Sequence, residues 1–94
     1  MTDDLQYFDG MESVELTIGG NTHEVQALRR PLAPRFESET QIDRAAWHVR
    51  ADNLDGDSPV VGNVLETDEE EWTVKEVERL SFGKRFRLVC ERTS

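Results

Sequence analysis

Two histidines and a single cysteine are the residues of this chain best suited to metal binding or nucleophilic catalysis. They are His23, His48 and Cys90. Structural zinc sites use closely spaced pairs of cysteines or histidines, and no two of these residues are spaced in that way. A catalytic cysteine needs an activating base, whereas the alternation around Cys90 predicts an inward, packed side chain. We therefore expect no metal, no cofactor and no enzymatic activity.

The carboxylates between residues 52 and 57 resemble a calcium-binding loop at first sight. An EF-hand loop needs an oxygen ligand at its third position and a glycine at its sixth. In this chain Leu54 occupies the third position, and Gly56 comes one position too early. An ordinary surface turn is the interpretation that these residues favour.

Two tryptophans, Trp47 and Trp72, are candidates either for stacking on nucleotide bases or for the core. Barrels that bind single strands combine stacking aromatics with a basic groove, but the aromatic residues here lie among acidic ones. Burial of each indole would contribute about 3 kcal/mol, a large share of the net stability of a small domain. The core is therefore the favoured location of both.

Length and composition leave room for one small core. The chain has 94 residues, of which 36% are hydrophobic and 33% charged. A chain of this size forms one domain and has little apolar material for an enzyme pocket as well. No apolar run is long enough to span a membrane, and the acidic N-terminus lacks the basic start of a signal peptide. These features predict a soluble protein that is made in the cytoplasm.

The formal charge of −9 is unevenly distributed along the chain. Residues 1–13 and 51–71 contain acidic but no basic residues, whereas basic residues predominate in residues 72–94. Duplex DNA is bound largely through clustered lysine and arginine, so an acidic chain of this kind is poorly suited to hold it. The simpler interpretation of the acidic loops is that they keep a small domain soluble.

The N-terminal half predicts an arm followed by a β-hairpin. Residues 1–12 sustain neither helical nor strand periodicity, so we expect a flexible N-terminal arm before one small β-barrel domain at residues 13–94. A short helix is the alternative for residues 1–12. Residues 14–18 alternate in polarity, and the glycines that follow suit a tight turn. Residues 22–28 then return as the second strand.

The middle of the chain is harder to assign. Pro31 and Pro34 are expected to end the hairpin, because proline lacks an amide donor. Residues 35–44 are polar with isolated apolar positions, which fits either a single helical turn or an excursion that contacts another molecule. Residues 45–54 alternate again and predict the third strand, and residues 55–59 predict a turn.

The C-terminal third predicts a three-stranded meander, with strands at residues 60–66, 71–77 and 85–91. The inward positions change phase within the second of these strands, so a β-bulge is expected near Lys75 and Glu76. Acidic and basic residues at helical spacing also allow a helix over residues 68–80. The β-branched residues of that segment favour a strand.

These patterns together predict a mainly β fold. We expect a small single-domain barrel of about six antiparallel strands with a C-terminal meander and room for one short helix. Closure of the barrel would hide the strand edges. The side chains expected to fill the core are Val14, Leu16, Ile18, Val25, Trp47, Val49, Trp72, Val74, Phe86, Leu88 and Cys90.

The meander carries three motifs, at residues 62–65, 72–74 and 86–90. They read Gly-Asn-Val-Leu, Trp-Thr-Val and Phe-Arg-Leu-Val-Cys. An apolar pair after a glycine or acid, an aromatic residue followed by x-Val, and a last strand of alternating basic and apolar residues are typical of one family. Over residues 45–92 the chain resembles the small head-tail joining proteins of tailed bacteriophages, which are also called head closure or stopper proteins.

The resemblance implies a structural role in virion assembly. The subunit would form a ring below the portal of a filled capsid, seal the exit and receive the tail. Its partners would be the portal or adaptor, tail proteins and further copies of itself, and DNA would pass through without being bound. The protein would reside in the host cytoplasm during assembly and then at the head-tail junction of the virion.

Charge suggests two sets of residues for such a ring. An acidic loop in the lumen would repel the phosphates of passing DNA. Its residues are Glu66, Asp68, Glu69, Glu70 and Glu71. Arginines could pair with acidic loops of the next subunit. The candidates for this subunit interface are Arg29, Arg30, Arg85 and Arg87.

A different class of function is also consistent with the charge. A monomeric acidic module that mimics DNA would block a nucleic-acid enzyme or bind another basic protein. It would bind its partner tightly and in a salt-sensitive manner, and it would form no ring.

Overall fold

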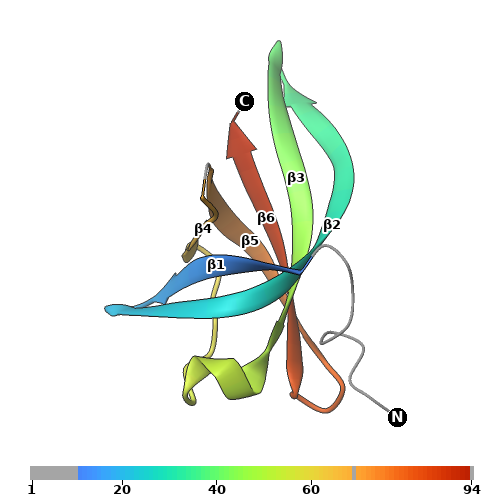
Figure 1. Cartoon of the computed structure of the whole chain (residues 1–94). Coiled ribbons are helices and arrows are strands. Elements are labelled where there is room, and N and C mark those ends of the chain that lie inside the picture. The colour runs from blue at the N-terminus through green and yellow to red at the C-terminus, as the bar shows by residue number, and fades with distance from the viewer. Residues whose placement is uncertain (1–10, 69, 94) are drawn as a thin grey trace.

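Six antiparallel strands close into a barrel (Figure 1) in the computed structural model of the chain, which describes residues 11–68 and 70–93. The elements are β1 (Met11–Ile18), β2 (Asn21–Glu37), β3 (Thr40–Arg50), the 3₁₀ helix η2 (Ala51–Leu54), β4 (Val64–Glu66), β5 (Glu71–Leu80) and β6 (Arg85–Thr93). Around the barrel the strand order is β1-β2-β3-β6-β5-β4. The predicted mainly β barrel with a C-terminal meander is therefore confirmed.

The first hairpin forms where the alternation predicts it. Ile18 pairs with Asn21, and Gly19 has a φ of 61°, which a residue without a side chain adopts at little cost. β1 begins at Met11, inside the segment predicted to be an arm. Residues 1–10, which make up the rest of that arm, lie outside the described part of the chain.

The second strand does not end at Pro31 as predicted. β2 continues to Glu37, and among the described residues its second half pairs with β3 alone, because the pairing with β1 ends at the Met11–Leu28 pair. On the open side of such an edge a proline removes no hydrogen bond from a ladder, so the strand tolerates Pro31. A register shift between Leu32 and Arg35 accommodates Pro34 in the strand.

The single helical turn considered for residues 35–44 is therefore wrong, and the alternative of an excursion that contacts another molecule stays a prediction. These residues form the outer part of the β2–β3 hairpin, which extends beyond the other strands (Figure 1). Two hydrogen bonds tie its base to β6: Arg35 Nε and Nη2 donate to the carboxylate of Glu91 at 3.1 and 2.9 Å. These bonds from Arg35 are the main reason that the pKa of Glu91 is lowered.

The third strand ends earlier than predicted. Residues 45–54 do not form one strand, because the chain turns into η2 after Arg50. The turn brings Leu54 into the core, where its side chain is fully buried. Leu54 also accepts a hydrogen bond from the amide of Asp57 at 2.8 Å, so burial and hydrogen bonding favour the helical turn over further extension.

The first strand of the meander is shorter than predicted. β4 covers residues 64–66 instead of 60–66, because the side chain of Asn63 competes with strand pairing. Its Oδ1 accepts a hydrogen bond from the amide of Val60 at 2.8 Å, and the backbone of Asn63 donates to the carbonyl of Val60 at 3.2 Å. The resulting turn leaves Val60 and Val61 exposed.

The other two meander strands extend beyond the predicted ends. The pairing of β5 with β6 shifts register between Val74 and Glu76, which confirms the expected bulge. Residues 71–80 are extended, so the alternative of a helix over residues 68–80 is wrong. Among the described residues no helix is long and apolar enough to cross a membrane.

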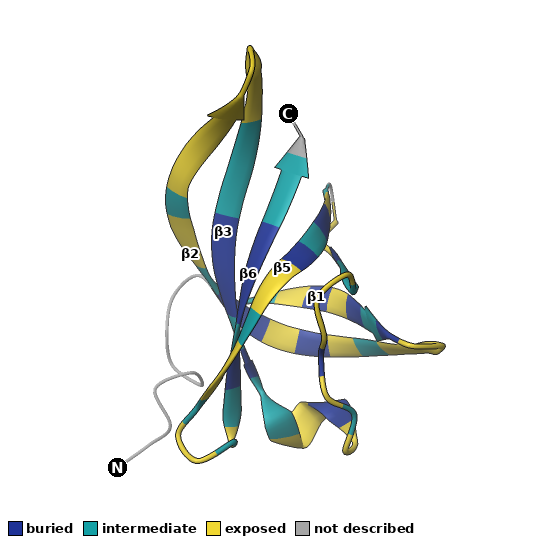
Figure 2. Cartoon of the chain, turned by 180° about the vertical axis from the view of Figure 1, so that it is seen from behind, coloured by how far each residue is buried: buried dark blue, intermediate teal, exposed yellow. Residues whose placement is uncertain are grey.

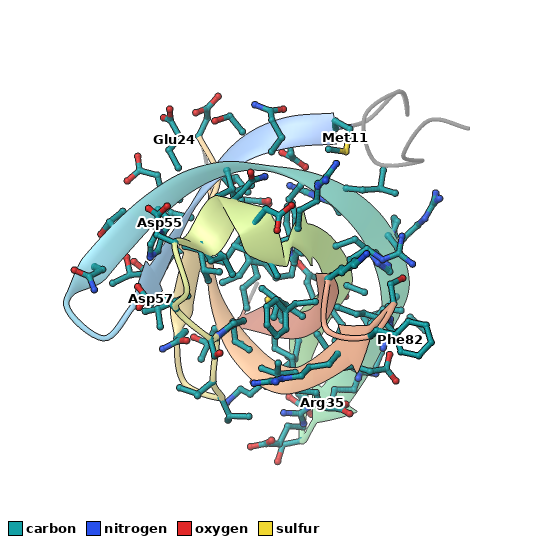
Figure 3. All side chains as sticks on the ribbon, turned by 90° about the horizontal axis from the view of Figure 1, so that it is seen from below. Met11, Glu24, Arg35, Asp55, Asp57 and Phe82 are labelled. Atoms are coloured by element: carbon teal, nitrogen blue, oxygen red, sulfur yellow. The ribbon has the colours of Figure 1, made fainter. Side chains whose placement is uncertain are left out.

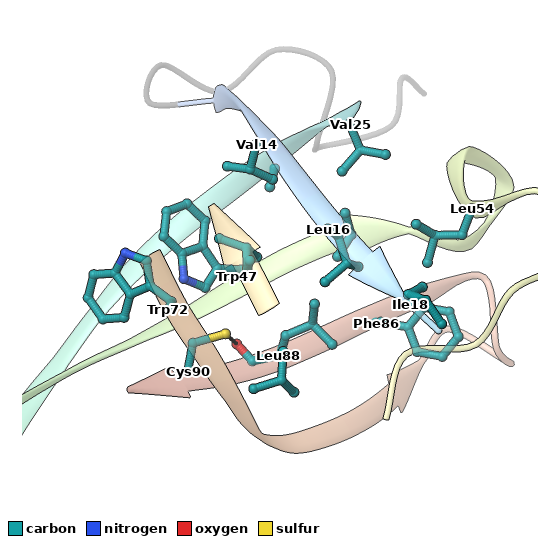
Figure 4. Packing of buried hydrophobic residues seen from close by; sticks show 14 of the residues in the cluster. Val14, Leu16, Ile18, Val25, Trp47, Leu54, Trp72, Phe86, Leu88 and Cys90 are labelled. Atoms are coloured by element: carbon teal, nitrogen blue, oxygen red, sulfur yellow. Dashed lines mark hydrogen bonds between the residues drawn. The ribbon is translucent and has the colours of Figure 1, made fainter. Parts of the chain in front are cut away.

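Every side chain predicted for the core is buried. Figure 4 shows the two tryptophans packed at one end of this core, with Ile18, Leu54 and Phe86 at the other. Along β1 and the first half of β2, buried and exposed residues alternate (Figure 2), as expected for strands with one face toward the core. Ala27, Ala45, Leu54 and Leu65 complete the packing.

Replacement of Trp72 by alanine should severely destabilise the barrel. The side chain is 4% exposed, and loss of a buried aromatic residue costs about 3 to 5 kcal/mol through lost contacts and a residual cavity. This is a large fraction of the stability of a domain of this size. We expect Trp72→Ala to be unfolded or aggregated, or to have a much lower urea midpoint than the wild type.

Phe82→Ala is the matched control, because Phe82 is fully exposed and alanine keeps its Cβ in the same left-handed backbone conformation. Its unfolding midpoint should stay close to that of the wild type. A Trp72→Ala protein with wild-type stability would contradict the assignment of Trp72 to the core.

Candidate functional site

Two arginines lie over the buried tryptophans at one end of the core. Trp47 and Trp72 pack edge to face, with ring centroids 6.0 Å apart and an interplanar angle of 72°. The guanidinium carbon of Arg29 lies 4.5 Å from the ring centroid of Trp47, and that of Arg92 lies 5.4 Å from the ring centroid of Trp72. We call Arg29 and Arg92 the arginine cap. Cation–π attraction and shielding of the indoles from water both stabilise this end of the barrel.

Three carboxylates hold the arginine cap in place. Arg29 Nε donates to Glu12 Oε1 at 3.1 Å, and its Nη2 donates to Glu70 Oε1 at 3.4 Å. Arg92 Nη2 lies 2.8 Å from Glu70 Oε2 and 3.2 Å from Asp43 Oδ2. Glu70 therefore bridges both arginines, and the contacts join residues from β1, β2, β3 and β6.

An open depression of about 360 Å³ lies beside the cap. Its lining consists of Glu12, Ser13, Arg29, Thr67, Asp68 and Glu70. Three carboxylates against one guanidinium make this depression acidic. Its charge disfavours phosphate groups.

The predicted lumen loop separates into residues with different environments. Glu66 ends β4 and pairs with Glu71 at the start of β5, and both side chains are exposed. Asp68 is exposed in the turn between them, whereas Glu70 is occupied by the arginine cap. Glu69 lies outside the described residues. A hydrogen bond from the amide of residue 67 to the carbonyl of residue 70, at 2.8 Å, closes the turn.

Glu66 and Glu71 belong to a larger row of glutamates on the outer surface. Across neighbouring strands, Glu24 of β2 lies opposite Glu15 of β1, Glu15 lies opposite Glu66 of β4, and Glu66 lies opposite Glu71 of β5. All four side chains are exposed. We call these residues the glutamate row. Side chains directly opposite each other are about 5 Å apart at Cβ, and like charges in such pairs are destabilising.

The predicted interface arginines also lie in two different environments. Arg29 points inward as part of the arginine cap, because the strand alternation places it on the opposite side from Arg30. Arg85 and Arg87 of β6 lie on the outer surface, where their positions are opposite Arg50 and His48 of β3. Ion pairs reach this group from exposed carboxylates, Arg50 with Asp52 at 3.5 Å and Arg87 with Glu78 at 3.9 Å.

We call Arg30, His48, Arg50, Arg85 and Arg87 the basic face. Its charges are close enough to affect each other, since the pKa of His48 is lowered by burial first and then by Arg85, Arg87 and Arg30. His48 Nδ1 and Arg85 Nε are buried atoms for which the described residues supply no hydrogen-bond acceptor. Sequence reasoning identified three of its arginines but missed Arg50 and His48, which the strand register places beside them.

A third polar cluster joins the start of β2 to the segment after η2. His23 Nε2 lies 2.7 Å from Asp57 Oδ2, and Asn21 Nδ2 donates to the same oxygen at 3.3 Å. Asp55 Oδ2 lies 4.0 Å from His23 Nδ1, and Asp55 and Asp57 lie on the same side of the barrel in Figure 3. Within the described residues, no group of three or more metal-ligating side chains could hold an ion. The contacts instead fasten this turn to the barrel.

Two phenylalanines are exposed in segments outside the barrel wall. Phe36 lies near the tip of the β2–β3 hairpin and is 65% exposed. Phe82 is fully exposed in the turn between β5 and β6, and its ring points away from the barrel (Figure 3). Its φ of 58° is unusual for a bulky residue and costs about 1 to 2 kcal/mol.

Comparisons with protein-family models, with curated proteins and with solved structures find no match to this chain. The resemblance to phage head-tail joining proteins therefore stays a hypothesis based on the meander motifs and the order of elements.

Removal of the ionisable group at position 48 should change how stability depends on pH. Because the pKa of His48 is lowered on folding, the unfolded chain takes up the proton first as the pH falls through its ordinary value near 6.5. The stabilisation is fully present above that pH and is lost below it. Relative to His48→Gln, the wild type should lose free energy of unfolding as urea titrations are moved from pH 8 to pH 5.5.

The charged groups around His48 are Arg30 on β2, Arg85 and Arg87 on β6, and Glu78 on β5. Of these groups, Glu78 is the one that raises the pKa of His48. A wild type that gained stability over His48→Gln in acid would show that this carboxylate outweighs burial and the arginines.

The thiol of Cys90 should resist alkylation in the folded protein. Its side chain is fully buried, and burial raises its pKa to about 12, so the reactive thiolate is scarce at neutral pH. We expect a thiol reagent at pH 8 to label the native protein much more slowly than the protein in denaturing urea. Equally fast labelling in both conditions would contradict a closed barrel around Cys90.

Proposed function

We propose that this chain is a structural assembly protein of a tailed phage or prophage, a head-tail joining or head closure subunit that forms a ring below the portal. The observation that carries the proposal is an exposed phenylalanine at each end of the molecule. The β2–β3 hairpin, with Phe36, and the β5–β6 turn, with Phe82, extend from opposite ends of the barrel (Figure 1). A subunit that joins two neighbours needs contacts at both ends.

The hairpin has the features of a segment that becomes stable on contact with a partner. Residues 36–41 pair only with each other among the described strands, and an isolated two-stranded ribbon is marginally stable in water. Arg35 and Glu91 fix the base of the hairpin but leave Phe36 in solvent. Burial of this side chain in a partner would recover about 1.5 to 3 kcal/mol.

The β5–β6 turn supports the same conclusion independently. Ser81 and Phe82 both have positive φ, which tight hairpin turns require but which glycine or asparagine would adopt at lower cost. A bulky apolar residue at such a position stabilises neither the turn nor the core. Strained backbone is concentrated at functional sites, so we interpret the exposed ring of Phe82 as a contact residue.

The charge of the chain fits a channel through which DNA passes. A net charge of −9 opposes stable binding of phosphates, and the acidic depression at the barrel end repels them locally. In the proposed role the portal or adaptor contacts one end of the subunit and the tail contacts the other. The protein would assemble in the host cytoplasm and remain at the head-tail junction, and the role needs no catalytic group or cofactor.

The glutamate row favours a second candidate function, an acidic DNA mimic that binds a nucleic-acid enzyme or another basic protein. Four exposed carboxylates in line present a regular negative surface. The basic face opposes this candidate, because a mimic gains nothing from a cluster of arginines on its own surface. The mimic would be a monomer, whereas the joining protein forms a ring.

Electron microscopy of the protein mixed with the portal protein of the phage or prophage that encodes it tests the proposed function. We expect a ring of density below the portal. Phe36→Ser or Phe82→Ser, whichever residue faces the portal, should weaken the association about tenfold or more, because the buried ring contributes over 1.4 kcal/mol.

Val61→Ser is the matched control, since Val61 is also exposed but lies in the turn before β4. It should assemble like the wild type. Absence of any association between the wild-type protein and the portal would refute the joining role.

A further inference from the structure

Two oppositely charged surfaces of this chain each carry a cost in electrostatic repulsion, and on the basic face the ion pairs of Arg50 with Asp52 and of Arg87 with Glu78 offset part of it. In the glutamate row, three successive cross-strand pairs consist of two carboxylates each. In the basic face, Arg50 lies opposite Arg85, and His48 lies opposite Arg87. Like charges directly opposite each other destabilise a sheet, so both arrangements oppose folding. Real proteins depart from locally favourable arrangements chiefly at functional or strained sites.

The two surfaces lie on opposite sides of the barrel. The glutamate row crosses β2, β1, β4 and β5, whereas the basic face covers β2, β3 and β6. In the strand order β1-β2-β3-β6-β5-β4, β1 is diametrically opposite β6, and β4 is diametrically opposite β3. One copy therefore presents a negative side and a positive side that face in different directions.

This placement decides which symmetry an association can have. A two-fold dimer brings the same patch of both copies together, so it would set glutamates against glutamates or arginines against arginines. A head-to-tail contact instead sets the negative side of one copy against the positive side of the next. Each copy then keeps one free face of each kind, and the contact repeats until a ring closes or a filament grows.

The spacing of the charges is also compatible. Both surfaces are built from directly opposite residues on paired strands, about 5 Å apart. Residues two apart on one strand, such as Arg85 and Arg87, are about 7 Å apart, which is within reach of flexible arginine side chains. Arg85 Nε is buried and has no acceptor among the described residues, so a carboxylate of another copy would be reached through the terminal nitrogens of this guanidinium.

We propose that copies of this chain associate head to tail, with the glutamate row of one copy docked on the basic face of the next. The inference rests on the proposed function in one respect, because a ring of joining subunits needs two different lateral faces. It assigns Glu15, Glu24, Glu66 and Glu71 to one side of the contact. The other side consists of Arg30, His48, Arg50, Arg85 and Arg87.

This assignment changes the roles expected from the sequence. Arg29 takes no part, because it is held in the arginine cap by Glu12 and Glu70 of its own chain. Glu66 and Glu71, which were expected in the lumen, are assigned to the subunit contact instead. Glu15 and Glu24 are assigned to the same contact. Of the predicted loop acids that are described, Asp68 is the one that stays exposed outside the contact.

Two charge-reversed proteins test the contact without a portal. The row-reversed protein carries Glu15→Lys and Glu71→Lys, so that each new lysine lies opposite a remaining glutamate. We expect its stability to equal or exceed that of the wild type, because repulsion within the row becomes attraction. The face-reversed protein carries Arg85→Glu and Arg87→Glu. Circular dichroism and urea unfolding show whether each protein is folded. If the face-reversed protein is unfolded, a protein with Arg85→Gln and Arg87→Gln takes its place.

Sedimentation equilibrium of each protein, alone and in mixture, measures the association. The wild type should self-associate at low ionic strength and dissociate as salt is added. Each reversed protein alone should associate about tenfold more weakly or not at all, because it sets like charges together. An equimolar mixture of the two should recover association. The intact glutamate row of the face-reversed protein can dock on the intact basic face of the row-reversed protein, and the two reversed surfaces are also complementary in charge.

A control protein with Glu39→Lys and Asp68→Lys has the same net charge as the row-reversed protein, but its changes lie outside both faces. It should associate like the wild type, which separates local complementarity from total charge. The proposal is overturned if the wild type stays monomeric at low ionic strength. It is equally overturned if the mixture of reversed proteins fails to associate, or if the control loses association as the row-reversed protein does.

Failure of this inference differs from failure of the joining function. A protein that self-associates through these faces but never binds a portal keeps the head-to-tail contact and loses the joining role. A protein that binds a portal although both reversed proteins associate normally keeps the joining role and loses the contact.

Discussion

Closure of the barrel between β1 and β4 is the constraint on which the surface of this protein depends. The seam consists of three residue pairs. Inside it, Leu16 lies opposite Leu65 and both are fully buried, which stabilises the fold by about 1.5 to 3 kcal/mol per side chain. Outside it, Glu15 lies opposite Glu66, at a cost of under about 1 kcal/mol. The buried pair outweighs the exposed one, so hydrophobic packing holds repelling charges in place.

Local alternation was sufficient to predict the core but not the ends of the strands. The inward positions followed from a period of two, and the bulge between Val74 and Glu76 followed from a break in that period. The length of β2 did not follow, because the effect of Pro31 depends on whether a strand lies on each side of it. That is a property of the sheet and not of the segment.

The charged surfaces were predictable only in part for a related reason. Arg85 and Arg87 share a face because they are two residues apart on one strand, which the sequence shows directly. Glu15 and Glu24 lie beside Glu66 only through the register of three strands, and no local pattern specifies that register. Arg29 and Arg30 are neighbours in sequence yet lie on opposite faces, so a predicted pair of interface arginines became one cap residue and one surface residue.

The open edge of β2 has a consequence for how this chain behaves when crowded. From Arg29 to Glu37 the strand pairs on one side only among the described residues, and Pro31 and Pro34 remove two amide donors from this stretch. An edge without a continuous set of donors is a poor template for extending a sheet by backbone pairing. Many copies brought close together are thereby protected against irreversible amyloid-like growth, which leaves reversible contacts between side chains as the route by which they meet.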